Sequence, residues 1–145
     1  MPEAEIEAAF PQLNHLNYHI TSDETPFYNC AAWAAEVVSI PWWPIEGGGY
    51  YWPPTARCEP SIAAFVAAYG SIGYEVCADA VLEAGHEKIA IYAKNGLPEH
   101  VARQLESGRW TSKLGEYEDI SHLSHVLLQG DTYGYVAVFM RRLSP

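Results

Sequence analysis

Cys30 and His100 are the two residues of this sequence whose types and order are best suited to covalent chemistry. Cys30 stands in the segment Tyr-Asn-Cys-Ala-Ala-Trp-Ala, at the expected first turn of a helix, and His100 opens an expected strand seventy residues later. A thiol at a helix N-terminus lies against unpaired backbone N–H groups and the positive end of the helix dipole, which lower its pKa. The pair therefore predicts a thiol nucleophile with an imidazole base.

Each member of this pair has a definite expected role. Cys30 would attack a carbonyl carbon, and His100 would take the thiol proton and return it to the leaving group. Backbone N–H groups near Cys30, helped by the side chain of Asn29, would hold the oxyanion. The competing interpretation is structural, because a free cysteine on the apolar stripe of its own helix is usually a core residue.

The third member of the site depends on the register of the turn at residues 107–108. A two-residue turn places Lys113 on the face of His100, whereas a three-residue turn places Ser112 there. Asp119 and His122 follow soon after and are also able to orient the imidazole. The sequence leaves Ser112, Asp119 and His122 as alternatives.

An aromatic-rich stretch at residues 42–52 offers walls for a substrate cleft, although such a cluster often only covers a small core. The predicted cleft residues are Trp33, Trp43, Trp52, Gln104 and Lys113.

The pattern of turns and periodicity predicts an α+β protein, with N-terminal helices packed on a mainly antiparallel sheet, in one domain over residues 1–145. Helices are expected over residues 3–10, 30–40, 61–69 and 121–128. Strands are expected over residues 18–21, 74–77, 88–93, 99–105, 109–114 and 133–141, and a long ordered loop over residues 40–60.

Composition excludes several classes of protein. The net charge of −10, from 18 acidic and 8 basic residues, disfavours nucleic acid and anionic lipid as partners. The three cysteines fit a reducing compartment, and the N-terminus lacks a secretory signal pattern, so a cytoplasmic location is expected. No cofactor and no metal are expected, with a mononuclear site of Cys30, His100 and His122 as a minority alternative.

Four segments carry a resemblance to a family of small bacterial proteins catalogued as a domain of unknown function, DUF7689. They begin at Tyr28, His100, Gly108 and Asp119, and the similarity runs over nearly the full length. The family brings no activity that could be transferred.

The order of Cys30 and His100, and the segment Ser-Lys-Leu-Gly at residues 112–115, more loosely resemble papain-like and NlpC/P60-like cysteine peptidases and amidases. Only Cys30 and His100 carry over from that resemblance, since Glu24 stands where those enzymes have a glutamine. The likeness implies a papain-like arrangement of helix and sheet.

These features predict a cysteine-dependent acyl-transfer enzyme acting on a peptide or another amide or thioester. Hydrolase, transglutaminase and deamidase share the nucleophile and are not separated by the sequence. The alternative from a different class is a non-catalytic binding or immunity-type protein that uses its acidic surface to recognise a basic protein partner. The oligomeric state is left open.

Overall fold

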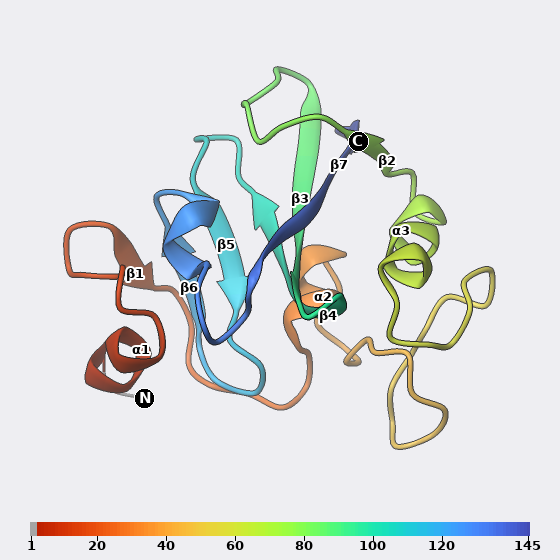
Figure 1. Ribbon diagram of the computed structural model, residues 1–145, viewed down its shortest axis with the longest axis horizontal. Coiled ribbons are helices and arrows are strands. Elements are labelled where there is room, and N and C mark those ends of the chain that lie inside the picture. Colours follow the sequence, from red (N-terminus) through yellow and green to blue (C-terminus); the bar gives the residue numbers. More distant parts are fainter. Residues whose placement is uncertain (1–2) are drawn as a thin grey trace.

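The computed structural model describes residues 3–145 and consists of one open antiparallel sheet with short helices on both faces (Figure 1). In chain order the elements are α1 (Glu3–Ala9), β1 (Tyr18–Ile20), α2 (Cys30–Ala34), α3 (Ile62–Gly70), β2 (Glu75–Cys77), β3 (His86–Lys94), β4 (Leu97–Gln104), β5 (Trp110–Lys113), β6 (Asp119–His122), the 3₁₀ helix η1 (His125–Leu128) and β7 (Tyr135–Leu143). None of these helices has the length and apolar character needed to cross a membrane.

The sheet has seven strands in the order β1-β6-β5-β4-β3-β7-β2. Strands β3 to β6 form a meander, β7 returns to pair with β3, and the short strands β1 and β2 are the edges. The prediction of an α+β protein with a mainly antiparallel sheet is confirmed. The predicted strand boundaries agree with β1 to β5 and β7 to within a few residues.

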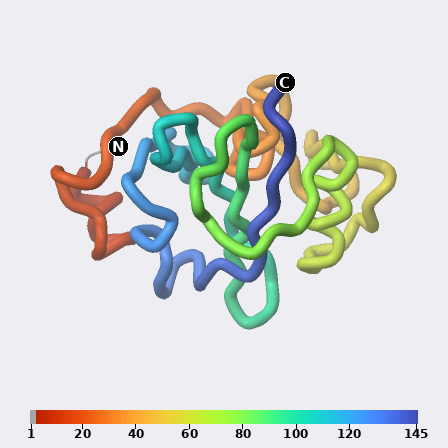
Figure 2. The backbone as a smooth tube through the Cα atoms, turned by 90° about the horizontal axis from the view of Figure 1, so that it is seen from above, coloured from red at the N-terminus to blue at the C-terminus, as the bar shows by residue number. Residues whose placement is uncertain are grey.

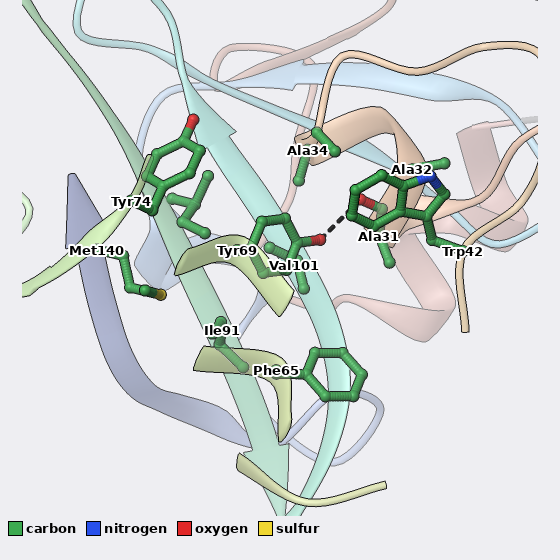
Figure 3. Packing of buried hydrophobic residues seen from close by; sticks show 12 residues of the cluster. Ala31, Ala32, Ala34, Trp42, Phe65, Tyr69, Tyr74, Ile91, Val101 and Met140 are labelled. Carbon is green, nitrogen blue, oxygen red and sulfur yellow. Dashed lines mark hydrogen bonds between the residues drawn. The ribbon is translucent and has the colours of Figure 1, made fainter. Parts of the chain in front are cut away.

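Side chains alternate between the two faces of the sheet, and each face has its own hydrophobic cluster. The face covered by α2 and α3 contains Ile89, Ile91, Val101 and Met140 from the strands, packed against Ala31, Ala32, Phe65 and Tyr69 from the helices. In this cluster the Tyr69 hydroxyl donates to the carbonyl oxygen of Ala31 at 2.7 Å, which joins α3 to α2 (Figure 3). The opposite face, covered by α1 and η1, contains Ala90, Tyr92, Ala102, Trp110 and Ile120, packed against Ile6, Phe10 and Leu128.

The two ends of the molecule are formed by segments that lie outside the meander of strands. The N-terminal segment with α1 lies at one end, and the aromatic-rich loop with α3 lies at the other (Figure 2). Residues 40–60 form a loop, as expected from their proline and glycine content. Within this loop an isolated β-bridge joins Trp42 to Tyr51. The meander between these ends carries the candidate site.

Helix α2 is much shorter than the three turns that the apolar stripe predicts. It ends in a Schellman motif, in which the N–H of Val37 donates to the carbonyl of Ala32 and the N–H of Glu36 to that of Trp33. Glu36 adopts a φ of 63°, a conformation that favours glycine. Its carboxylate binds Arg142 at 2.8 Å, and this ion pair helps to offset the strain. A left-handed glutamate is not marked in a sequence pattern, so the predicted extension was wrong.

The predicted helix over residues 121–128 is also wrong in its first half. Asp119 to His122 form strand β6, which pairs with β5, and the 3₁₀ helix begins only after Ser124, whose hydroxyl caps it. Ile120 and His122 are buried on the same face, so the period of two belongs to a strand.

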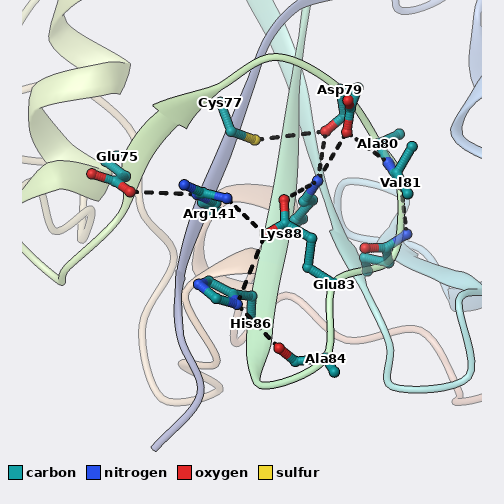
Figure 4. A network of polar contacts seen from close by, with 11 residues as sticks. Glu75, Cys77, Asp79, Ala80, Val81, Glu83, Ala84, His86, Lys88 and Arg141 are labelled. Carbon is teal, nitrogen blue, oxygen red and sulfur yellow. Dashed lines mark hydrogen bonds and ion pairs between the residues drawn. The ribbon is translucent and has the colours of Figure 1, made fainter.

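A polar network fixes the segment between β2 and β3 against the sheet (Figure 4). Lys88, only 1% exposed, binds Glu83 at 2.9 Å and Asp79 at 3.1 Å, and Arg141 binds Glu83 at 2.6 Å. Because both acidic residues neutralise a buried ammonium group, this network accounts for Lys88 as a structural residue.

Candidate functional site

Cys30 is the first residue of α2, and its side chain lies where β4 and β5 separate. The ladder between these strands consists of the pairs Arg103–Thr111 and Gln104–Trp110. The N–H of Leu105 donates to the carbonyl oxygen of Arg109, towards the β5 side of β4. Because N–H directions alternate along a strand, the N–H of Val101, four residues earlier, also points towards the β5 side. This N–H faces the thiol of Cys30. The sulfur thus occupies the opening that an extended ladder would close.

The charge of Cys30 acts on residues of both faces of the sheet. Burial, and then the charge of Cys30, raises the pKa of Tyr69, which belongs to the face covered by α2 and α3. The same two causes, in the same order, raise the pKa of Tyr133, which packs on the opposite face. Cys30 is therefore coupled electrostatically to one tyrosine on each face.

His100, Ser112 and His122 form a chain of hydrogen bonds across three neighbouring strands. Nε2 of His100 on β4 lies 2.9 Å from Oγ of Ser112 on β5, and this Oγ lies 2.8 Å from Nε2 of His122 on β6. Nδ1 of His122 lies 2.9 Å from the carbonyl oxygen of Ser124. All three side chains are fully buried. We call this chain the relay.

The relay determines which ring nitrogen of each neutral histidine carries the proton. The carbonyl of Ser124 can only accept, so Nδ1 of His122 is the protonated nitrogen and its Nε2 accepts from the Ser112 hydroxyl. Having donated its proton, Oγ of Ser112 accepts from Nε2–H of His100. Nδ1 of His100 is therefore unprotonated, and among the described residues it has no hydrogen-bond partner. The relay leaves a bare imidazole nitrogen as a base.

Burial of the site favours the neutral forms of its titratable groups. Burial lowers the pKa of His122 to about 4 and that of His100 well below its ordinary value. Burial raises the pKa of Cys30 to about 11, against the opposite effect of nearby N–H groups and the charge of Lys113. The pKa lowering expected from the helix N-terminus is thus reversed by desolvation, because α2 has only five residues and the thiol is 6% exposed. The resting pair is a thiol and a neutral imidazole.

Tyr133 holds the imidazole of His100 from its other side. The two rings are stacked, with centroids 4.1 Å apart and planes at 4°. Tyr92, which pairs with His100 across the ladder, contacts the imidazole edge at 5.3 Å. These contacts fix the plane of the imidazole while Ser112 fixes its rotation. Nothing in the sequence pattern marks Tyr133 except the two glycines, Gly130 and Gly134, that bound its turn.

Asp119, the remaining alternative for the third position, does not contact His100. Its carboxylate accepts from the Tyr28 hydroxyl at 2.8 Å, on the α2 side of the sheet. Lys113 lies over the Tyr28 ring, and its ammonium group donates to the carbonyls of Thr25 and Gly115 at 2.9 and 2.7 Å. Asp119 and Lys113 therefore hold the segment that leads into Cys30.

The other residues predicted for the cleft are not brought together around Cys30. Trp43 and Trp52 both pack against Phe65 of α3. Trp33 donates to Thr111, and the amide of Gln104 donates to the carbonyl of Ala80. The structure gives each of them a packing or tethering contact.

Asn29, predicted for the oxyanion, has a capping role in the structure. Its Oδ1 accepts from the N–H groups of Ala32 and Trp42, and its Nδ2 donates to the Trp42 carbonyl at 2.7 Å. The N–H groups of Cys30, Ala31 and Val101 face the thiol instead. Main-chain donors are thus the ones nearest to the sulfur.

Within residues 3–145, no three side chains of histidine, cysteine, aspartate or glutamate come close enough to hold a metal ion. Cys30, Cys58 and Cys77 are all free thiols.

The relay predicts a stability cost for Ser112→Ala. The change leaves one ring nitrogen of each histidine without its partner in a dry site, so the free energy of unfolding should fall by about 2–3 kcal/mol. Ser121→Ala is the matched control, because Ser121 is half-buried on β6 and its hydroxyl only accepts from Arg109. For this control, urea unfolding should show a loss of less than about 1 kcal/mol in the free energy of unfolding. Equal losses for the two variants would contradict the relay.

Fold and site together define an α+β protein in which a short cysteine-bearing helix packs on an antiparallel sheet that carries a His–Ser–His relay. Residues 19–141 match the family model described as a domain of unknown function, DUF7689, and the protein belongs to that family. No curated protein and no solved structure matches the chain.

Proposed function

We propose that the protein is a cysteine-dependent acyl-transfer enzyme of papain-like arrangement, with Cys30 as nucleophile and His100 as general base. The observation that supports this proposal is that Nδ1 of His100 is unprotonated and has no hydrogen-bond partner among the described residues. His100 precedes Val101, whose N–H faces the thiol of Cys30. A buried nitrogen with a free lone pair is costly unless it has a use. Proton abstraction from Cys30 is such a use.

In the proposed enzyme the thiol and the imidazole come from opposite faces of the sheet. Helix α2 brings Cys30 from the face of Val101, while His100 packs with Tyr92 and Tyr133 on the opposite face. The opening between β4 and β5 is the place at which they would meet. An unbroken ladder would separate them, so the early end of this ladder has a functional explanation.

The reaction steps follow from the tautomer. The Cys30 proton passes to Nδ1 of His100 as Sγ bonds to the carbonyl carbon, and the relay stabilises the imidazolium through Ser112. The N–H groups of Cys30 and Ala31 are the nearest donors for the oxyanion. Collapse breaks the bond from carbon to the leaving nitrogen or sulfur, which takes the proton from Nδ1. Water or an amine, deprotonated by the same nitrogen, then attacks the carbonyl carbon of the Cys30 thioester. The carbon–sulfur bond breaks, and the proton on Nδ1 returns to Sγ, which restores the thiol and the neutral imidazole.

Acylation by S-phenyl thioacetate tests this proposal. Intact-mass analysis and peptide mapping should find one acetyl group, on Cys30, formed well before any adduct on the exposed Cys58. The Cys30→Ala variant should stay unmodified over the same period. Acetylation of Cys58 before Cys30 in the folded protein would overturn the proposal.

The burial of Cys30 favours a second candidate function, a binding protein for a basic partner in which the thiol is only a core residue. The net charge of −10 suits electrostatic steering towards such a partner. The acylation experiment separates the two candidates, because a core thiol would react only when the protein unfolds. Adding a subdenaturing amount of urea should then accelerate the reaction of Cys30, whereas an enzyme site should lose activity.

A further inference from the structure

A cavity of about 240 Å³ lies between α1, the turn after β5 and the turn before β7. Ile6, Ala9 and Phe10 line it from the first side, Leu114 and Gly115 from the second, and Tyr133 from the third. No charged side chain contributes to its lining. Ala9 and Gly115 are exposed, so the cavity opens to solvent beside them.

The cavity and the candidate site share one wall. Tyr133 lines the cavity and is also stacked on the imidazole of His100 at 4.1 Å. Leu114 and Gly115 follow Ser112 and Lys113 directly, at the end where β5 has separated from β4. The side chain of Tyr133 is therefore in contact with both the cavity and the imidazole of the candidate site.

The lining selects the chemistry of an occupant. Aliphatic side chains and aromatic rings offer no partner for a charge, and the hydroxyl of Thr132 at the rim already donates to the carbonyl of Ala9 at 2.7 Å. An apolar protein cavity of about 150 Å³ is sufficient for benzene. The cavity here has room for one phenyl or branched aliphatic group with its linking atoms.

We infer that this cavity binds the apolar acyl group of the substrate, so that the protein acts on acyl donors with an aromatic or branched aliphatic acyl chain. The inference rests on the proposed function and adds the substrate class to it. Tyr133 then has two contacts, one with the acyl group and one with the base.

Two thioesters and two substitutions of alanine by phenylalanine test the inference. S-phenyl 3-phenylpropanethioate should acylate Cys30 at least about tenfold faster than S-phenyl thioacetate, since burial of one phenyl group is sufficient for such a preference. Ala9→Phe fills the mouth of the cavity and should remove the preference for the larger thioester. Ala8→Phe is the matched control, because Ala8 is exposed on the same helix and does not line the cavity.

Each outcome has a distinct meaning. Equal rates for the two thioesters in the unmodified protein would overturn the cavity inference and leave Cys30 as the nucleophile. A preference that survives in Ala9→Phe would place the acyl group elsewhere and also overturn it. Failure of both thioesters to acylate Cys30 would refute the proposed function itself, and the inference with it.

Discussion

Replacing His100 with glutamine is expected to slow the alkylation of Cys30 by iodoacetamide at pH 7 by about 100-fold or more, the usual contribution of a general base. In the unmodified protein the neutral imidazole accepts the thiol proton as the carbon–sulfur bond forms, so no thiolate has to be present beforehand. The neutral imidazole and the thiol are both present between the pKa of His100, below 6.5, and that of Cys30, about 11. The rate should therefore be nearly constant from about pH 6.5 to 9.

The variant should have a different pH profile as well as a lower rate. Without the imidazole the thiolate forms only by losing its proton to solvent, so the rate should rise about tenfold per pH unit until pH approaches 11. Cys58, which is exposed, is the internal control and should react at the same rate in both proteins. Parallel profiles for Cys30 in the two proteins would show that His100 is not its base.

Gly134→Ala is expected to lower the free energy of unfolding by at least about 3 kcal/mol. Gly134 has a φ of 73°, and a Cβ there would lie 2.0 Å from the carbonyl oxygen of Ala93. Because Ala93 pairs with Tyr135 in the ladder of β3 and β7, relief of this contact requires the strands to move apart. Tyr133, which adjoins this glycine, should then lose its stack on His100.

Gly96→Ala is the matched control for this change. Gly96 has a φ of 78°, yet a Cβ there would have no neighbour within 4 Å. Gly96→Ala introduces the backbone strain alone, so the free energy of unfolding should fall by only about 1–2 kcal/mol. Urea unfolding of both variants measures the difference, and similar losses would contradict the close packing of Gly134 on β3.

The arrangement of the sheet was predictable where period-two patterns and turn residues agree. Asn95 and Gly96 mark the turn between β3 and β4, and both residues have positive φ values, as such a turn requires. Strand β6 was not predictable in this way, because Leu123 and Leu127, four residues apart in the segment that follows it, fit a helical spacing. Pairing with β5, a tertiary interaction, decides in favour of a strand.

The hydrogen bonds that join the predicted site residues His100, Ser112 and His122 were not predictable from the sequence. Ser112 and His122 were among the alternatives for the third position, and the structure uses them in series, with Ser112 between the two imidazoles. Asp119 points to the other face because side chains alternate along β6. The raised pKa of Cys30 was not predictable, since it depends on the depth at which the sheet surrounds the thiol.

The packing of the aromatic loop also depends on contacts that the sequence does not contain. Trp43 and Trp52 both contact Phe65, so their rings pack against the hydrophobic cluster under α3. Tyr133, in contrast, is isolated in the sequence and acquires its place at the site only through the turn between Gly130 and Gly134.

The protonation state of the His100 ring tests the central claim most directly. Nitrogen-15 NMR of the ring nitrogens at pH 7 should show a neutral imidazole with the proton on Nε2 and an unprotonated Nδ1, and His122 should carry its proton on Nδ1. This pattern would establish the base that the relay leaves for Cys30. A proton on Nδ1 of His100, in a neutral ring or an imidazolium, would contradict the account, because that nitrogen could not accept the thiol proton.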